Sequence, residues 1–443
     1  MLNVRLTETA GLAQADSKTR LSGAWEKLLA GAKAGKNGFG WFSLPEKDIS
    51  ELKTMGAELA KFRYIILIGI GGSALGSQML MNALLHPCYP YAGTKDRPVV
   101  FVADNADAAS NEAIWEQLEP AKTAILAVSK SGRTLETLSN FLFFRKKLYA
   151  VLGEETEKHI FAVTDPVKGF LHAYATEKGT RCVELPEDTG GRYSVLTSCG
   201  LVGAAAMGMN VDQLLAGAGA MKKALMANPE TSIASVIAEA TTGAGETGRN
   251  VTVFWAYSDK LKSVGEWFAQ LWGESLGKEG KGMTPQAALG SIDQHSQLQL
   301  YTSGPADKFF FFLNEKTPDA EPLSIPEGKL FDEARYLEGI SSAKILEYER
   351  RGVVASLKRR KLPICEIELD KTDEFCIGGL VFLLETVTAL TGFMMNIDPF
   401  DQPGVEEGKN YALALCGNAS YAKYMDVLKE IEANSKSVEF TIA

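Results

Sequence analysis

The sequence predicts an α/β protein built from two doubly wound parallel sheets. Short runs of β-branched and aromatic residues alternate with longer segments of helical periodicity, and this alternation is typical of parallel sheets. The alternation stops near residue 190 and resumes near residue 250, which indicates two such units. A chain of 443 residues is long enough for two or three domains with a large apolar core.

Buried strands are expected in both halves of the chain, at Tyr64–Ile68, Val99–Ala103, Thr123–Val128, Ile160–Val163, Val251–Ala256, Phe309–Leu313 and Ile364–Ile367. Helices are expected between and after them, at Ser73–Leu85, Thr134–Leu152, Leu261–Trp272, Phe331–Lys358 and Glu374–Met395. A run of helix-forming residues, Val211–Glu239, joins the two halves. A glycine-rich turn is expected directly after it, at Thr242–Gly248.

These elements divide the chain into four expected regions. Residues 1–50 form an N-terminal extension, and residues 51–215 form the first α/β domain. Residues 216–375 form the second domain, and residues 376–443 form C-terminal helices that complete the site.

Composition narrows the class of protein. The 46 basic and 55 acidic residues give a net charge of −9, which argues against a nucleic-acid-binding protein.

Six cysteines are spread along the chain without a CxxC pair, so we expect reduced thiols in a cytoplasmic protein. No secretory signal is visible at the start of the sequence. The long uncharged stretches 64–94 and 193–211 contain glycine or proline, so we expect buried core segments and no membrane span.

The first chemical motif is Ile68-Gly-Ile-Gly-Gly-Ser-Ala-Leu-Gly76, which follows an expected strand and opens an expected helix. Its glycines, including Gly72, let a ligand approach the backbone, and Ser73 lies at a helix start that favours an anion. A sugar or phosphate contact is one reading. A dinucleotide site is another, because Gly69, Gly71 and Ala74 satisfy GxGxxG/A. A purely structural turn is the third.

The second motif is Ser129-Lys130-Ser131-Gly132-Arg133-Thr134, again between a strand and a helix. Three hydroxyl groups, two cations and a helix N-terminus in six residues suit a phosphate monoester. The alternative is an ordinary helix start capped by Ser131 or Thr134.

Two further segments hold candidate charged groups. Arg192 follows two glycines that can bring it close to a ligand, although a lone arginine is more often an exposed loop residue. Glu274 stands beside Trp272, and a carboxylate in a partly apolar pocket can act as a base; a solvated acid is the alternative. Gly273-Glu-Ser-Leu-Gly277 also matches the GxSxG motif of serine hydrolases. A helix precedes it instead of a strand, which disfavours a nucleophile at Ser275.

The remaining candidates are His295 and Lys409. His295 lies in Asp293-Gln-His-Ser-Gln297, where acidic and amide neighbours can orient the ring for proton transfer; a buried structural histidine is the alternative. A helix is expected to start at Val405, which places Lys409 one turn in and on the side that Gln402 faces, unless it is a plain surface lysine. No metal-ligand spacing is present.

Together these segments resemble the phosphoglucose isomerase family over residues 60–412. The signatures that carry the resemblance are IGIGGSALG, SKSGRTLET, GGRYSVLTSCGL, QLWGESLGK, DQHSQLQLY and FDQPGVEEGK. The resemblance implies two sugar isomerase domains, each a five-stranded parallel sheet between helices, and a homodimer with shared active sites. It also implies reversible isomerisation of glucose 6-phosphate and fructose 6-phosphate through a cis-enediol(ate), in glycolysis and gluconeogenesis. Neither a metal nor an organic cofactor is implied.

The resemblance also implies roles for single residues. Glu274 resembles the base that moves a proton between C2 and C1, and Arg192 resembles the cation that stabilises the enediolate. His295, reaching in from the neighbouring subunit, and Lys409 resemble the residues that open the sugar ring. The remaining matches are substrate or phosphate contacts: Gly72, Ser73, Ser129, Lys130, Ser131, Thr134, Gln270 and Gln402. Arg133 departs from the family, which has a small hydroxyl residue there, and puts that one contact in doubt.

Overall fold

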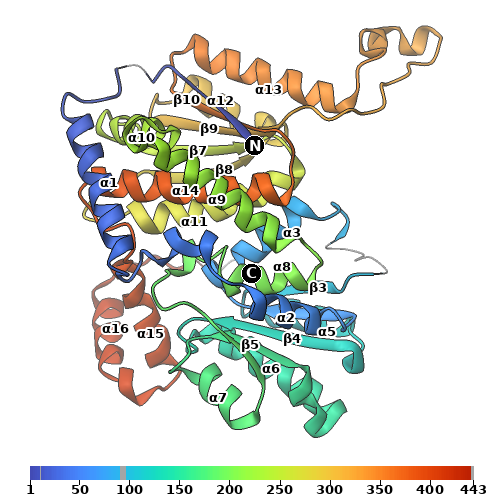
Figure 1. The fold of residues 1–443 in the computed structure, drawn as a ribbon, viewed down its shortest axis with the longest axis vertical. Coiled ribbons are helices and arrows are strands. Elements are labelled where there is room, and N and C mark those ends of the chain that lie inside the picture. Colours follow the sequence, from blue (N-terminus) through green and yellow to red (C-terminus); the bar gives the residue numbers. More distant parts are fainter. Residues whose placement is uncertain (10, 90–95, 441–443) are drawn as a thin grey trace. The chain divides into compact units, whose positions relative to one another are not determined.

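The computed structural model describes residues 1–9, 11–89 and 96–440. The chain divides into two compact units, Met1–Phe400 and Asp401–Ala443. The first unit contains two five-stranded sheets, which Figure 1 shows with helices between them and on their outer faces.

The first sheet has the strand order β3-β2-β4-β5-β6, and all its neighbouring strands are parallel. Its strands are β2 (Tyr64–Ile68), β3 (Val99–Ala103), β4 (Thr123–Ser129), β5 (Ile160–Thr164) and β6 (Arg181–Glu184). The chain runs outward from β2 to β3 on one side and from β4 to β6 on the other. The order therefore reverses between β2 and β4. Ligands of open α/β sheets bind beyond the carboxyl ends of the strands at such a switch point.

The second sheet has the strand order β1-β10-β9-β7-β8. Four of its strands are parallel: β7 (Val251–Ala256), β8 (Thr284–Leu289), β9 (Lys308–Glu315) and β10 (Ile364–Leu369). The fifth strand, β1 (Leu2–Thr7), pairs antiparallel with β10. The resemblance implied an all-parallel second sheet, and this edge strand is a correction to it.

Strand alternation places the core on both faces of each sheet. In β2, Ile65 and Leu67 join the large central cluster, whereas Ile66 and Ile68 point into a smaller cluster on the other face. Phe309 and Phe311 of β9 enter the same central cluster from the second sheet. One continuous apolar core therefore joins the two sheets within the first unit.

Helices of the first unit fill the space between the sheets and cover their outer faces (Figure 1). α9, α11 and α14 lie between the sheets, whereas α6 and α7 cover the first sheet and α12 and α13 the second. The helices are α1 (Ser17–Lys33), α2 (Ser50–Leu59), α3 (Leu75–Leu84), α5 (Ala108–Glu116), α6 (Leu135–Leu152), α7 (Phe170–Lys178), α8 (Ser198–Ala206), α9 (Val211–Ala227), α10 (Ile233–Glu246), α11 (Lys262–Leu276), α12 (Leu298–Ser303), α13 (Ser342–Arg359) and α14 (Glu374–Met394).

The helix α14 is long and apolar enough to cross a membrane by length and composition. Its most apolar window is 94% buried in the fold, and the helix packs against α9, α10 and α1. α14 is therefore the central core helix of the first unit. The two uncharged stretches noted in the sequence form buried strand and helix where they are described; residues 90–94 lie outside the described ranges.

All seven expected strands are confirmed, and two expectations about helices are wrong. The expected helix Phe331–Lys358 is two elements, a 3-10 helix at Lys329–Leu337 and α13. Gly339 takes a φ of +75° between them, and Ser341 then caps α13 by accepting from the Lys344 N–H. The expected turn Thr242–Gly248 is mostly helix, because α10 continues to Glu246.

The helical glycine Gly243 has a packing role in place of the expected turn. A Cβ atom there would lie 1.9 Å from the Leu12 carbonyl oxygen, so glycine permits a close backbone approach.

The second unit contains α15 (Glu406–Leu415) and α16 (Lys423–Asn434). Tyr411 and Tyr424 pack edge to face at 5.8 Å between ring centres, and the Asn410 amide donates to the Tyr424 hydroxyl at 3.1 Å. The helix start expected at Val405 is confirmed to within one residue, because Val405 is the N-cap and α15 begins at Glu406.

Candidate active site

The loop after β2 lies against the loop that carries Arg192. A Cβ atom on Gly72 would lie 2.3 Å from the backbone of Gly191, so the contact requires glycine. The Gly72 carbonyl accepts from the Ser194 hydroxyl and from the Cys199 thiol, both at 3.2 Å. Burial raises the pKa of Cys199 to about 11, which keeps it a neutral thiol. These contacts bring the loops that carry Gly72 and Arg192 together beyond the carboxyl end of β2.

Arg192 is buried, with 2% of the residue exposed, and its guanidinium is held on several sides. Nε donates to the Ser275 hydroxyl at 2.8 Å, and Nη2 donates to the Pro399 carbonyl at 2.7 Å. Nη1 lies 3.4 Å from Glu274 Oε2. The alternative of an exposed loop arginine is therefore wrong.

Glu274 and Gln270 lie one turn apart on α11. The Gln270 amide donates to Glu274 Oε1 at 3.1 Å, so both carboxyl oxygens of Glu274 have a donor nearby. Gln270 Oε1 is buried and has no hydrogen-bond partner in the described part of the chain. A buried acceptor of this kind is suited to a ligand hydroxyl. A third of the Glu274 side chain is exposed, so a substrate can reach it.

The carboxylate and the guanidinium form a pair that can move a proton and stabilise the resulting negative charge. Their 3.4 Å separation is longer than the 2.7–2.9 Å usual for a tight ion pair. Catalytic hydrogen bonds are often long before substrate binds. Ser275 lies in the last turn of α11 with no exposed surface, so the hydrolase motif GxSxG has neither the strand nor the accessible serine that it needs.

The loop after β4 gathers three hydroxyl groups at the start of α6. Thr134 Oγ1 lies 3.4 Å from Ser129 Oγ and 3.3 Å from Ser131 Oγ. Thr134 occupies the N-cap position but makes no capping hydrogen bond with its side chain. The alternative of an ordinary capped start is therefore wrong for Thr134. This uncapped helix N-terminus, surrounded by hydroxyls, suits an anion.

The two cations of this loop behave differently. Lys130 Nζ donates to the carbonyls of Glu187 and Thr189, each at 2.8 Å, and burial lowers the pKa of Lys130. Lys130 thus ties the β4 loop to the segment that precedes Arg192. Arg133 is exposed, and its side chain makes no hydrogen bond or ion pair within the described residues.

His295 lies in a 3-10 turn, Ile292–His295, directly after β8. Its side chain is exposed, and its ring has no hydrogen-bond partner among residues 1–9, 11–89 and 96–440. The neighbouring Asp293 fixes the turn by accepting from the Leu289 N–H at 2.7 Å and the Ser296 hydroxyl at 2.6 Å. The alternative of a buried structural histidine is therefore wrong.

Gln402 and Lys409 belong to the second unit. Lys409 is exposed in the first turns of α15, and its ammonium lies 3.2 Å from Glu406 Oε1. Gln402 directly precedes the 3-10 turn that leads into this helix. Their approach to Glu274 stays a prediction.

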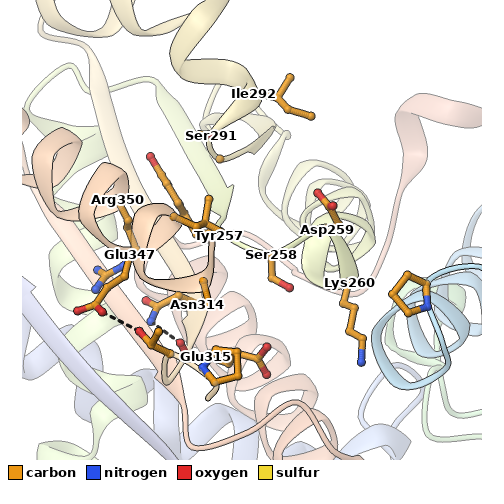
Figure 2. A pocket seen from close by; sticks show the side chains of 16 residues that line it. Tyr257, Ser258, Asp259, Lys260, Ser291, Ile292, Asn314, Glu315, Glu347 and Arg350 are labelled. Atoms are coloured by element: carbon orange, nitrogen blue, oxygen red, sulfur yellow. Dashed lines mark hydrogen bonds between the residues drawn. The ribbon is translucent and has the colours of Figure 1, made fainter. Parts of the chain in front are cut away.

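A cavity of about 560 Å³ lies at the carboxyl ends of β7, β8 and β9. Figure 2 shows Asn314, Glu315, Glu347 and Arg350 on one side of it and Asp259 and Lys260 on the other. None of the twelve expected site residues lines it. The candidate active site is instead the junction of the β2 loop, the Arg192 loop and α11.

Fold and site together are typical of two-sheet α/β enzymes that act on phosphorylated sugars. The family model described as phosphoglucose isomerase matches residues 47–296. The glucose-6-phosphate isomerase of Carboxydothermus hydrogenoformans is 35% identical over 441 residues, covering 95% of this chain and 94% of that protein. The enzyme of the same name from Rubrobacter xylanophilus is 38% identical and covers 80% of this chain and 82% of that protein. This chain belongs to the phosphoglucose isomerase family.

Solved structures agree in fold. A hypothetical protein from Thermus thermophilus superimposes with a TM-score of 0.83 at 32% identity, covering 94% of this chain and 100% of that one. A glucose-6-phosphate isomerase from Chlamydia trachomatis superimposes with a TM-score of 0.76 at 20% identity, over 94% of this chain and 90% of that one. The expected α/β fold class is confirmed.

Proposed function

We propose that Glu274, Arg192, His295 and Lys409 carry out the reversible isomerisation of glucose 6-phosphate and fructose 6-phosphate, the reaction that family membership assigns to this chain. The observation that carries the proposal is the Glu274–Arg192 pair, in which a third of the Glu274 side chain is exposed. By its family, the chain acts in glycolysis and gluconeogenesis.

The chemistry begins with ring opening, which we assign to His295 and Lys409. Glu274 then removes the proton from C2 of the open-chain aldose, and the electron pair of that C–H bond moves to the C1 carbonyl oxygen. The product is a cis-enediolate whose negative charge lies near the Arg192 guanidinium. Glu274 returns the proton to C1 while the hydroxyl proton of O2 transfers to O1, so O2 becomes the ketone oxygen and O1 becomes a hydroxyl. Atoms and charge balance without any other reactant.

The phosphate group serves as a handle remote from the reacting carbons. We assign it to the uncapped start of α6, with Ser129, Ser131 and Thr134 as hydroxyl partners. The two carbonyl contacts of Lys130 support a role in holding the loop together, in addition to its positive charge. Gly72, Ser73, Gln270 and Gln402 complete the proposed contacts to the sugar. Binding the handle orients C1 and C2 toward Glu274.

A homodimer with shared sites is part of the proposal. The exposed His295 ring supports it, because a ring-opening residue needs to reach a substrate. Two exposed apolar side chains close to His295 in the sequence also support it, since Ile292 is 62% and Leu300 is 55% exposed. We also propose a cytoplasmic location, which the six free cysteine thiols support. The proposed domain boundaries remain those expected from the sequence.

A coupled assay tests the function directly. The purified chain should convert fructose 6-phosphate to glucose 6-phosphate without added metal or nicotinamide, apart from the cofactor of the coupling enzyme. Inorganic phosphate should inhibit competitively by occupying the α6 start. Absence of conversion, with the chain folded and concentrated enough to form dimers, would contradict the proposal.

A further inference from the structure

Ser275 follows the proposed base and is fully enclosed by the fold, with none of its surface exposed. Its hydroxyl oxygen accepts the Arg192 Nε–H at 2.8 Å, and the Tyr193 hydroxyl lies 3.3 Å away. An arginine side chain has donors only, so Ser275 is the acceptor in this contact. Ser275 therefore contacts the cation of the proposed catalytic pair, Arg192, from a fully buried position.

Two hydrogen bonds at different nitrogens fix the plane of the Arg192 guanidinium. Ser275 holds Nε, and the Pro399 carbonyl holds Nη2 at 2.7 Å. Because the guanidinium is planar and rigid, anchoring these two nitrogens sets the direction of Nη1. Nη1 then faces Glu274 Oε2 at 3.4 Å.

Tyr193 in turn holds the Ser275 hydroxyl group in place. Its ring stacks on Trp41 at 5.4 Å and meets Phe400 edge to face at 5.3 Å. Burial raises the pKa of Tyr193, so its hydroxyl stays neutral and close to Ser275. The chain of contacts runs from the aromatic core through Tyr193 and Ser275 to Arg192.

We propose that Ser275 is a positioning residue for the isomerisation, which aims Arg192 at the charge that develops on the substrate. This inference rests on the proposed role of Arg192. Without the Ser275 oxygen, the guanidinium keeps its charge but can rotate about its remaining anchors. Misalignment of such a group lowers the rate of the chemical step far more than it weakens substrate binding.

The test compares Ser275→Ala with Ser263→Ala. Ser263 lies on the same helix and is also buried, but its hydroxyl has no partner within the described residues, which makes it a matched control. Ser275→Ala should lower kcat about 10- to 100-fold with KM within about threefold of wild type. Ser263→Ala should leave both constants unchanged. Thermal unfolding of each variant shows how much folded enzyme is present, and kcat is expressed per folded chain.

A double-variant cycle shows whether Ser275 acts through Arg192. Lysine at 192 keeps the positive charge but lacks the Nε–H that Ser275 holds in a guanidinium. Ser275→Ala should therefore change kcat by no more than about twofold when made in Arg192→Lys. Ser275→Thr, which keeps the hydroxyl, should recover most of the activity lost in Ser275→Ala.

Two outcomes overturn the inference. One is a kcat of Ser275→Ala equal to that of Ser263→Ala. The other is an equal loss from Ser275→Ala in the wild-type and Arg192→Lys backgrounds, because Ser275 would then act independently of Arg192. A different result, full activity of Arg192→Lys itself, would instead refute the proposed role of Arg192, so the two failures are distinguishable.

Discussion

At the scale of single residues, Glu274 and Arg192 stand 82 positions apart in the chain and meet at 3.4 Å in the fold. Glu274 also contacts Gln270, and Arg192 also contacts Ser275. Both of these partners lie on α11. α11 therefore positions both the proposed base, Glu274, and the proposed stabilising cation, Arg192. Sites built on a helix hold such geometry more closely than sites on loops.

Glu274→Gln should remove nearly all turnover while leaving substrate binding intact. Glutamine has nearly the same shape, and its amide oxygen can still accept a hydrogen bond from Arg192, but it cannot accept the C2 proton. Loss of a general base costs about 10²–10⁴ in rate. Steady-state kinetics measure kcat, and an isotherm with a competitive sugar-phosphate inhibitor measures binding.

Glu266→Gln is the matched control, since Glu266 lies on the same helix but is exposed and pairs with Lys262 at 3.6 Å. It should have wild-type kinetics. Glu274→Gln with a kcat within tenfold of this control would show that another group removes the proton.

The candidate site residues could be selected from short sequence motifs, but several of their contacts could not be predicted. Pattern and resemblance pointed to Arg192 as a cation for the substrate. Its burial and its bond to Ser275 depend on a loop and a helix far apart in sequence. Lys130 was expected to contact phosphate, and its two carbonyl bonds are visible only in three dimensions. Periodicity and motif spacing carry no information about such long-range partners.

At the scale of elements, the predictable strands are those with two buried faces. The seven expected strands are short, mostly apolar runs, and all of them except β3 lie in the interior of their sheets, where parallel strands are usually apolar on both faces. The three that were missed, β1, β6 and β8, lie at sheet edges. Their sequences mix polar and apolar residues, and β8 contains Pro285, which is compatible with an edge strand only.

The loop between β4 and α6, which we propose binds the phosphate, allows a prediction at the scale of elements. Ser131→Ala combined with Thr134→Ala should raise KM for sugar phosphates and lower kcat/KM, because each lost charge-assisted hydrogen bond is worth about 1.5–3 kcal/mol. Ser139→Ala, an exposed serine further along α6, is the control and should change neither constant. Inhibition by inorganic phosphate should weaken in the double variant by a similar factor. An unchanged KM would place the phosphate elsewhere.

The core helix α14 predicts a pH dependence of stability. Glu385 is fully buried in this helix, and neither carboxyl oxygen has a partner in the described part of the chain. Burial raises the pKa of Glu385 well above its ordinary value of 4.5. The folded state therefore retains a proton that the unfolded state loses above that pH, so the free energy of unfolding falls as pH rises.

Glu385→Gln should remove this pH-dependent loss of stability. Its stability relative to wild type should increase with pH above the ordinary carboxyl pKa of 4.5, by at most about 1.4 kcal/mol per pH unit. Urea unfolding at pH 5 and pH 8 measures the difference. Glu374→Gln, in the first turn of the same helix, should show no such trend. A Glu385→Gln difference that is constant from pH 5 to pH 8 would mean that Glu385 is ionised in the folded chain.

At the scale of the whole molecule, the shared-site proposal predicts complementation between inactive subunits. Mixing Glu274→Gln with His295→Ala chains under conditions of subunit exchange produces heterodimers in which one site has both lesions and the other has neither. Half of a statistical mixture is heterodimer, so about a quarter of wild-type activity should return under two-fold symmetry. Demonstrated exchange without recovery would show that His295 acts within its own chain.

The central claim is that Glu274 isomerises the sugar phosphate by carrying a proton between C2 and C1, with an enediolate as the intermediate. The most direct measurement is nuclear magnetic resonance of the product formed from fructose 6-phosphate in heavy water. The wild-type chain should place deuterium at C2 of glucose 6-phosphate, because the proton on Glu274 exchanges with solvent before it is returned. Glu274→Gln should incorporate none over the same period. Conversion by the wild type with no deuterium at C2, or equal incorporation by Glu274→Gln, would contradict the account.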